Sequence, residues 1–318
     1  MSSSSSGQRR QTGLAEKLDG ALTIDLEDWR CALDPRPGMD HLNRPPVDES
    51  YLRQVTDRLL RELEARETKA TFFVLGEVAT AVPDLIQEIG QKGHEIASHS
   101  PVHLPPRLLP REELVSMIRR DVTLLEDLAG KNPVGFRAPY FAMRRDEGWL
   151  LRILADCGFL YDSSIVPTWT PYWGIPSAPK SPYRPDLSDL ARASPNGPVV
   201  EFPVTVWPSW KHLMGLPVGG GFYMRAWPTE ILFRLLRRNV AAGHLLVLYI
   251  HPGNLESEKE KITSPTVRDR ISQYSVAQRG ASSFHRLLRE FRLGTLAEVF
   301  SDELSRMGRE NDLMRSVS

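Results

Sequence analysis

The chain has 318 residues, and its 40 basic and 40 acidic side chains give a formal net charge of zero at pH 7. This balance argues against a strongly basic nucleic-acid-binding protein and against electrostatic adsorption to an anionic membrane. Its two cysteines, Cys31 and Cys157, are far apart and form no Cys-x-x-Cys pair. They therefore support neither a disulfide framework nor a thiolate zinc site, and they fit a reducing compartment.

The N-terminus is a serine run followed by Arg9 and Arg10, without the apolar region of a secretory signal. We predict a disordered tail over residues 1–18 and a C-terminal extension over 301–318. No window reaches the roughly 20 apolar residues that span a bilayer, the nearest being the strand-sized run Leu245–Ile250. We therefore expect a cytoplasmic protein without a transmembrane segment, and the sequence leaves its oligomeric state open.

Short apolar runs alternate with longer segments of helical period, a pattern typical of β/α units around a parallel sheet. The seven predicted strands are Ala21–Asp25, Ala70–Leu75, Glu95–Ser98, Val134–Ala138, Phe159–Tyr161, Val199–Phe202 and Leu245–Ile250. Helices are predicted around Leu52–Leu63, Pro83–Lys92, Leu114–Leu125, Asp146–Cys157, Pro228–Ala242 and Ser282–Phe291.

The segment Ser163–Pro198 interrupts this alternation. Eight prolines fall between Pro167 and Pro198, too many for regular secondary structure. Long loops within compact domains are often lids or binding walls, and Trp169 favours a wall here.

Polar groups of catalytic type follow the predicted strands at their carboxyl ends, where α/β barrels place active sites. They are Asp25, Glu27, Asp28, His99, His103, Arg137, Asp162 and His251. The close carboxylates at the first strand end repel each other, so a cation, hydrogen bonds or a retained proton must compensate them. His99 and His103, four residues apart, can reach one ion. Two imidazoles and one carboxylate leave a fourth position open on zinc, which is typical of a hydrolytic site.

These motifs, in this order, resemble those of the polysaccharide deacetylases, the family 4 carbohydrate esterases with a NodB-homology domain. The resemblance covers about residues 20–300. It rests on Asp25–Asp28, the His-Ser-x-x-His run His99–His103, Arg137–Tyr140, Asp162 and Leu248–His251. The Asp-x-Glu-Asp-Trp form of the first motif is most similar to the subgroup of bacterial exopolysaccharide loci.

The resemblance implies a single domain over residues 19–300, with a distorted (β/α)7-type barrel of the α/β class and a long Pro-rich loop. It implies a hydrolase that removes N-acetyl groups from amino sugars of a polysaccharide or its lipid-linked precursor. The cofactor implied is a divalent metal, Zn²⁺ by expectation, and the partner is an N-acetylated glycan rather than a nucleic acid.

By resemblance, His99 and His103 are metal ligands, Asp25 is the general base, and Arg137 pairs with that base. The backbone N–H of Tyr140, after Pro139, stabilises the oxyanion. His251 is the general acid, and Asp162 is the carboxylate that orients it and raises its pKa.

The third metal ligand is ambiguous, because Leu26 separates Asp25 from Glu27 where the family commonly has two adjacent aspartates. Strand periodicity puts Asp25 and Glu27 on one face and Asp28 on the other, but this alternation no longer applies if the chain leaves the strand here. As the third metal ligand, we favour Asp28 slightly over Glu27.

Aromatic residues that could stack on sugar rings are Trp169, Trp207 and Tyr223, with core packing an equal alternative for those beside Gly219–Gly221. That glycine run lacks a phosphate-loop pattern, so we expect close approach of the backbone to a ligand, or a bulge. The alternative functions are a small-molecule amide hydrolase, allantoinase-like or a deformylase, and a disabled glycan-binding protein.

Overall fold

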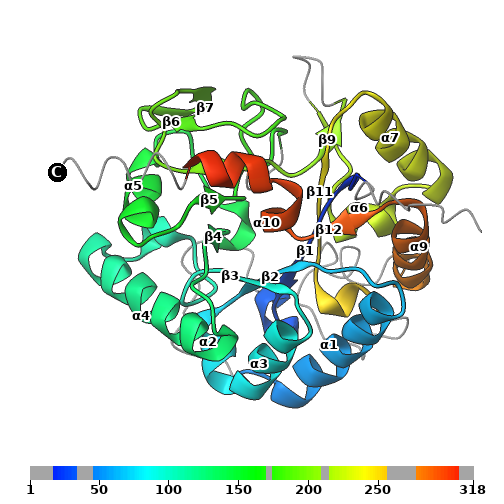
Figure 1. Cartoon of the computed structure of the whole chain (residues 1–318), viewed down its shortest axis with the longest axis horizontal. Coiled ribbons are helices and arrows are strands. Elements are labelled where there is room, and N and C mark those ends of the chain that lie inside the picture. The colour runs from blue at the N-terminus through cyan, green and yellow to red at the C-terminus, as the bar shows by residue number, and fades with distance from the viewer. Residues whose placement is uncertain (1–16, 34–45, 170–173, 209–214, 256–276, 308–318) are drawn as a thin grey trace, which may run out of the picture.

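A curled sheet of parallel strands lies at the centre of the computed structural model, with helices along its outside (Figure 1). The structure describes residues 17–33, 46–169, 174–208, 215–255 and 277–307. The strand order is β11-β1-β2-β3-β4-β5-β8, with the short β12 also pairing β1. Their bounds are β1 Gly20–Leu26, β2 Thr71–Val74, β3 Glu95–Ser98, β4 Gly135–Phe136, β5 Tyr161–Asp162, β8 Val200–Glu201, β11 Leu246–Ile250 and β12 Leu293–Gly294.

Each predicted strand is present, and the predicted α/β class with a (β/α)7-type barrel is confirmed. Between β8 and β11 the sheet is bridged by an irregular segment. The N–H of Thr205 donates to the carbonyl of Val247, and the N–H of Tyr249 donates to that of Gly219. The curl brings the carboxyl ends of the strands toward one another, so their terminal side chains can converge.

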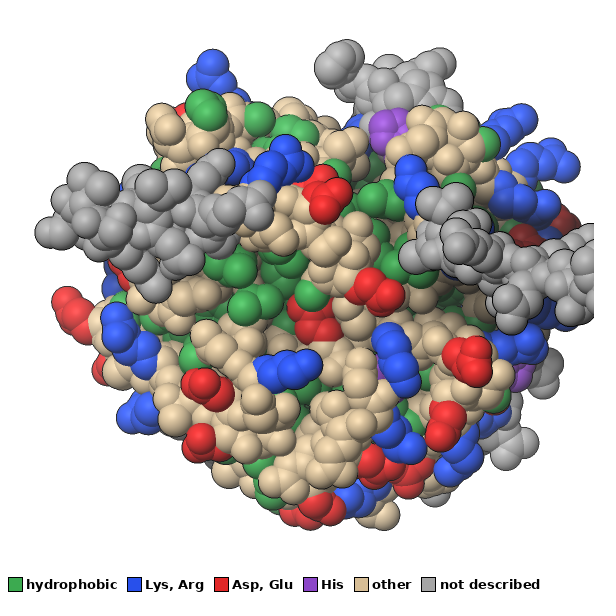
Figure 2. Space-filling model, viewed as in Figure 1, with side chains coloured by type: hydrophobic (Ala, Val, Ile, Leu, Met, Phe, Trp, Pro, Cys, Tyr) green, Lys and Arg blue, Asp and Glu red, His purple; other side chains and the backbone are tan. Residues whose placement is uncertain are grey.

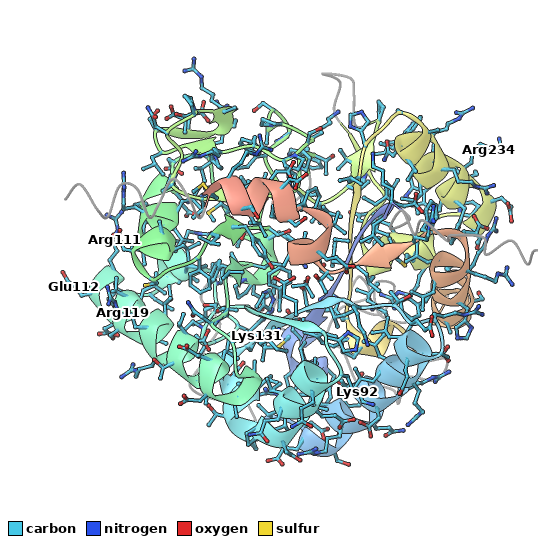
Figure 3. All side chains as sticks on the ribbon, in the orientation of Figure 1. Lys92, Arg111, Glu112, Arg119, Lys131 and Arg234 are labelled. Carbon is cyan, nitrogen blue, oxygen red and sulfur yellow. The ribbon has the colours of Figure 1, made fainter. Side chains whose placement is uncertain are left out.

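Helices cover the outside of the sheet. They are α1 Glu49–Glu64, α2 Gly76–Ala81, α3 Pro83–Gln91, α4 Arg111–Ala129, α5 Gly148–Asp156, α6 Gly221–Ala226, α7 Thr229–Ala241, α9 Ala277–Glu290 and α10 Leu296–Val299. The six predicted helices are confirmed, whereas α2, α6 and α10 were not predicted. Figure 3 shows Arg111, Glu112 and Arg119 on the outer edge of α4 and Arg234 on that of α7, as expected of amphipathic helices.

Short elements link these units. They are the 3₁₀ helices η1 Trp29–Leu33, η3 Pro106–Leu108, η4 Pro139–Phe141 and η5 Pro252–Leu255, and the strands β6 Pro185–Asp186, β7 Asp189–Ala193, β9 Val206–Trp207 and β10 Leu216–Pro217. Among the described helices, none combines the length and the apolar character that crossing a bilayer requires. On the face drawn in Figure 2, basic and acidic side chains are interspersed.

The C-terminal part of the described chain closes the amino end of the barrel. The N–H of Leu296 donates to Thr71 Oγ1, at the start of β2, and Ala297 donates to Glu95 Oε2, at the start of β3. Leu304 and Met307 pack in the same interior cluster as Phe73. Residues 301–307 of the predicted C-terminal extension are helical, and their buried side chains, Leu304 and Met307, join the barrel core. Residues 308–318, like 1–16 of the predicted tail, lie outside the described residues.

The prediction that Ser163–Pro198 has no regular structure is wrong for one part. Strands β6 and β7 form an antiparallel hairpin there. Its turn is stabilised by Asp186, whose Oδ1 accepts from both the N–H and the hydroxyl of Ser188. Pro185 opens a two-stranded ribbon, where a missing N–H is tolerated. At the glycine run the backbone lies close to an aromatic side chain, since a Cβ on Gly220 would lie 2.6 Å from the Tyr249 ring.

Candidate functional site

A buried ion pair joins the end of β1 to the residue after β4. Arg137 Nη1 lies 2.7 Å from Asp25 Oδ1, and neither side chain is more than 2 % exposed. The same guanidinium donates to Thr23 Oγ1 and to the carbonyl and hydroxyl oxygens of Ser163, and it lies over the Phe73 ring. The predicted pairing of Arg137 with Asp25 is confirmed, and these contacts fix the direction in which the carboxylate points.

Glu27 meets three histidines. Its Oε1 lies 2.8 Å from His99 Nε2 and 2.9 Å from His103 Nε2, and its Oε2 lies 3.5 Å from His251 Nε2. Burial opposes ionisation of Glu27, but Coulombic attraction to His103 and His251 and hydrogen bonds from His103 and His99 hold its pKa well below the usual value. The carboxylate therefore carries a negative charge in a nearly closed space.

The hydrogen bonds of His99 call for a cation at this point. Its Nδ1 lies 2.8 Å from the carbonyl oxygen of Arg137, and a carbonyl only accepts, so Nδ1 carries a hydrogen. In neutral His99, Nε2 then carries no hydrogen, and its lone pair faces a carboxylate oxygen. Burial disfavours the imidazolium, yet the hydrogen bond to Glu27 and the charges of Asp25 and Glu27 raise the pKa of His99. Either a second proton or a metal ion satisfies this arrangement, and the donor set suits a metal.

Asp28 points away from the histidines. Its Oδ2 lies 2.5 Å from Arg30 Nε and accepts from the N–H of Asp48, and its Oδ1 accepts from the N–H of Arg30. The reason is that β1 runs through Leu26, so strand alternation still holds and carries Glu27 to the face of Asp25. Where we expected Asp28 slightly ahead as a ligand, the structure has Glu27 beside the imidazoles.

The Tyr140 ring contacts that of His103 at a tilt of 57°, and the two ring centroids lie 4.2 Å apart. Tyr140 and Phe141 have φ values of 60° and 52°, an uncommon backbone for non-glycine residues that often marks a functional turn. The turn is anchored just before Pro139, because the N–H of Ala138 donates to Ser164 Oγ at 2.7 Å.

Asp162 was expected to orient His251, but its described side-chain contacts are with Ser164 and Glu201. Its Oδ1 accepts from Ser164 Oγ at 2.5 Å, and its carboxyl lies beside that of Glu201, on the neighbouring β8. Burial raises the pKa of Asp162 to about 6; burial and the Asp162 charge raise that of Glu201 well above its usual value. Both carboxyls therefore favour the protonated form more than free carboxyls do. Sequence reasoning missed Glu201, which is the last residue of β8 and the penultimate residue of the predicted strand Val199–Phe202.

The predicted sugar-stacking residues differ in position. Trp169 is 63 % exposed, after β5. Trp207 is half-buried in β9 and packs on the main hydrophobic core, which favours the packing alternative. Tyr223 is half-buried in α6 and packs against Phe222, with ring centroids 5.2 Å apart.

Cys31 lies near the proposed ligands, although its sequence context did not support a thiolate metal site. Glu27, Cys31 and His103 each offer a ligand atom, and these atoms lie within 4.8 Å of one another, so the group could hold a metal ion. Cys31 follows Glu27 by four residues, in the short 3₁₀ helix η1 that begins at Trp29, just after the end of β1.

Comparison with known proteins agrees with this geometry. A family model described as Polysaccharide deacetylase matches residues 46–160, and a Domain of unknown function (DUF3473) matches residues 163–301. A Bacillus cereus peptidoglycan-N-acetylglucosamine deacetylase is 34% identical over 28% of this chain and 32% of its own length. A Helicobacter pylori peptidoglycan deacetylase is 28% identical over 36% of this chain and 39% of its own length. A Cryptococcus neoformans chitin deacetylase is 32% identical over 27% of this chain and 18% of its own length.

The matched segment thus spans less than two fifths of each of these relatives. Two solved structures share the fold, each with a TM-score of 0.55. One is a Mycobacterium smegmatis protein designated as a polysaccharide deacetylase, 20% identical over 93% of this chain and 92% of its own. The other is Puue allantoinase, 15% identical over 90% of each chain.

Proposed function

The chain carries a polysaccharide deacetylase domain, and from that premise we propose that it is a metal-dependent hydrolase that removes N-acetyl groups from amino sugars. The substrate is a polysaccharide or its lipid-linked precursor, and the first motif favours an exopolysaccharide. The observation that carries this proposal is the meeting of Glu27 with His99 and His103, beside the Asp25–Arg137 pair.

In this proposal His99, His103 and Glu27 hold a divalent ion, Zn²⁺ by preference. Two imidazoles and a carboxylate are the donor types of hydrolytic zinc sites, and the lone pair of His99 Nε2 needs a cation. When bound, such an ion lowers the pKa of water and polarises an acetyl carbonyl.

Asp25 is the proposed general base. The guanidinium of Arg137 holds its Oδ1, which leaves the other oxygen to accept a proton from the attacking water. Because the pair is buried, the carboxylate cannot rotate freely into solvent, and its free oxygen keeps one direction. Arg137 is thus a positioning residue.

The turn at Tyr140 is the proposed oxyanion site. Its N–H would donate to the oxygen that gains charge as the carbonyl is attacked. Ser164 supports this turn through the N–H of Ala138, and the Asp162–Glu201 pair holds Ser164 in place. Asp162 therefore acts in the proposal on the Tyr140 side of the site.

His251 is the proposed general acid for the leaving amine. Its side chain is 36 % exposed, which suits a group that meets substrate, and Glu27 lies beside it. Trp169 and Tyr223 are proposed to contact the sugar chain.

The test is acetate release from N-acetylglucosamine oligomers, with allantoin and N-formyl compounds as parallel substrates, before and after chelation. We expect acetate from the oligomers and its loss on chelation. Turnover of allantoin or formyl compounds alone would replace the proposal by the amide-hydrolase alternative. Glycan binding without release of any acyl group would indicate the disabled glycan-binding protein.

A further inference from the structure

A thiol lies against the proposed metal site. The ligand atoms of Glu27, Cys31 and His103 are within 4.8 Å of one another, and Cys31 and His103 are 3 % and 2 % exposed. In a tetrahedral zinc site with bonds of about 2.0–2.3 Å, ligand atoms lie about 3.5 Å apart. A shift of roughly 1 Å in the side chains would bring all three onto one ion.

The backbone that carries Cys31 is firmly held. The residue lies in η1, and its N–H donates to the carbonyl of Asp28 at 3.2 Å. The Asp28 carboxylate in turn binds Arg30 and the N–H of Asp48, and Trp29 Nε1 donates to Asp48 Oδ2. Asp28 therefore fixes the turn that places the thiol beside Glu27.

Resting on the proposed function, we propose that Cys31 supplies a sulfur ligand to the metal held by Glu27, His99 and His103. Three ligands leave a zinc ion open, whereas a fourth closes it. The metal–sulfur bond forms as the thiol proton leaves to solvent, so no oxidant or reductant is needed. Such a ligand would close the site in its resting state.

This ligand also sets a metal preference. Thiolate is a soft donor that favours zinc, cobalt and cadmium over magnesium and calcium. Two imidazoles and a carboxylate already favour transition metals over magnesium and calcium, and sulfur adds a preference for softer ions such as cadmium. The competing explanation is that Cys31 is simply a small apolar side chain of the main hydrophobic core, to which it also belongs.

The decisive measurement is the absorption spectrum of the protein loaded with Co²⁺, because a thiolate on cobalt adds an intense charge-transfer band in the near ultraviolet. We expect this band in the native protein, its loss in Cys31→Ser, and its retention in Cys157→Ser. Cys157 is a matched control because it lies at the end of α5, in a different apolar cluster. A band that persists in Cys31→Ser would overturn the proposal.

X-ray absorption of the native zinc protein provides a test that needs no variant. One sulfur at about 2.3 Å beside lighter ligands at about 2.0–2.1 Å is expected. Bound metal with only nitrogen and oxygen neighbours would overturn the Cys31 assignment and leave the proposed function standing. Failure to bind zinc or cobalt at all would remove both.

Discussion

The guanidinium of Arg137 and the carboxylate of Asp25 form a buried pair, 2.7 Å apart, between the ends of two strands that are not neighbours in the sheet. Three further hydrogen bonds, to Thr23 and Ser163, complete the coordination of the guanidinium. A buried pair is costly to break from one side, because the remaining charge has no water to solvate it. Arg137, which follows one strand, thus holds the proposed base Asp25, on another strand, in one position.

Asp25→Asn tests the base. The amide oxygen can still accept from Arg137, so the fold and the metal should be retained while the proton acceptor is lost. We expect kcat to fall by about 10²–10⁴-fold. Steady-state kinetics and zinc content on one preparation measure both effects. A variant with near-native kcat and full zinc would remove Asp25 from the mechanism.

Glu27→Gln and Asp28→Asn separate the two candidate ligands. Loss of the Glu27 charge should weaken zinc binding by at least about ten-fold, whereas Asp28→Asn should leave zinc in place. Asp28→Asn should instead lower the free energy of unfolding by about 3 kcal/mol, because it breaks the buried contact with Arg30. Zinc titration and denaturant unfolding of both variants distinguish the roles, and the reverse pattern would restore Asp28 as the ligand.

Ser164→Ala tests the support of the Tyr140 turn. Without the hydroxyl, the N–H of Ala138 loses its acceptor and the Asp162 carboxyl loses a donor. We expect kcat to fall by about ten-fold or more with little change in KM, as a displaced oxyanion donor would cause. Ser188→Ala, in the exposed turn between β6 and β7, is the control. Equal kcat in both variants would contradict this role.

Asp121 gives a pH-dependent stability. Burial raises the pKa of this carboxyl on α4 to about 7, against a hydrogen bond from Ser98 and the charge of His99. Because the folded-state pKa exceeds the ordinary value, the stabilisation is complete below about pH 4 and is lost as pH rises through 7.

Asp121→Asn removes that loss. The free energy of unfolding of this variant, relative to the native protein, should rise between pH 4 and 8 by up to about 4 kcal/mol. Denaturant unfolding across this range measures the difference. Asp127→Asn, on an exposed position of the same helix, should show no such trend. A flat difference for Asp121→Asn would mean that this carboxyl ionises normally.

The sheet and the converging strand ends could be predicted because apolar runs and their polar ends are local in the sequence. Asp25 and Arg137 were found in this way. The same reasoning could not choose between Glu27 and Asp28 as the metal ligand. That choice depends on how far β1 extends and on the hydrogen bonds that Asp28 accepts from Arg30 and Asp48.

Contacts between elements that are distant in the chain could also not be predicted from the sequence. Asp162 and Glu201 lie near the ends of separate strands, and only the pairing of β5 with β8 brings their carboxyls together. The hairpin of β6 and β7 depends on the Asp186 turn, which the surrounding prolines obscured. Cys31 was dismissed for want of a second cysteine, although its partners are a carboxylate and an imidazole.

Zinc back-titration of the chelated protein, with acetate release from N-acetylglucosamine oligomers followed at each step, tests the central claim most directly. If Glu27, His99 and His103 hold the catalytic metal, activity should return in proportion to bound zinc and level off at about one ion per chain. Full activity in chelated protein, or zinc that binds without restoring acetate release, would contradict it.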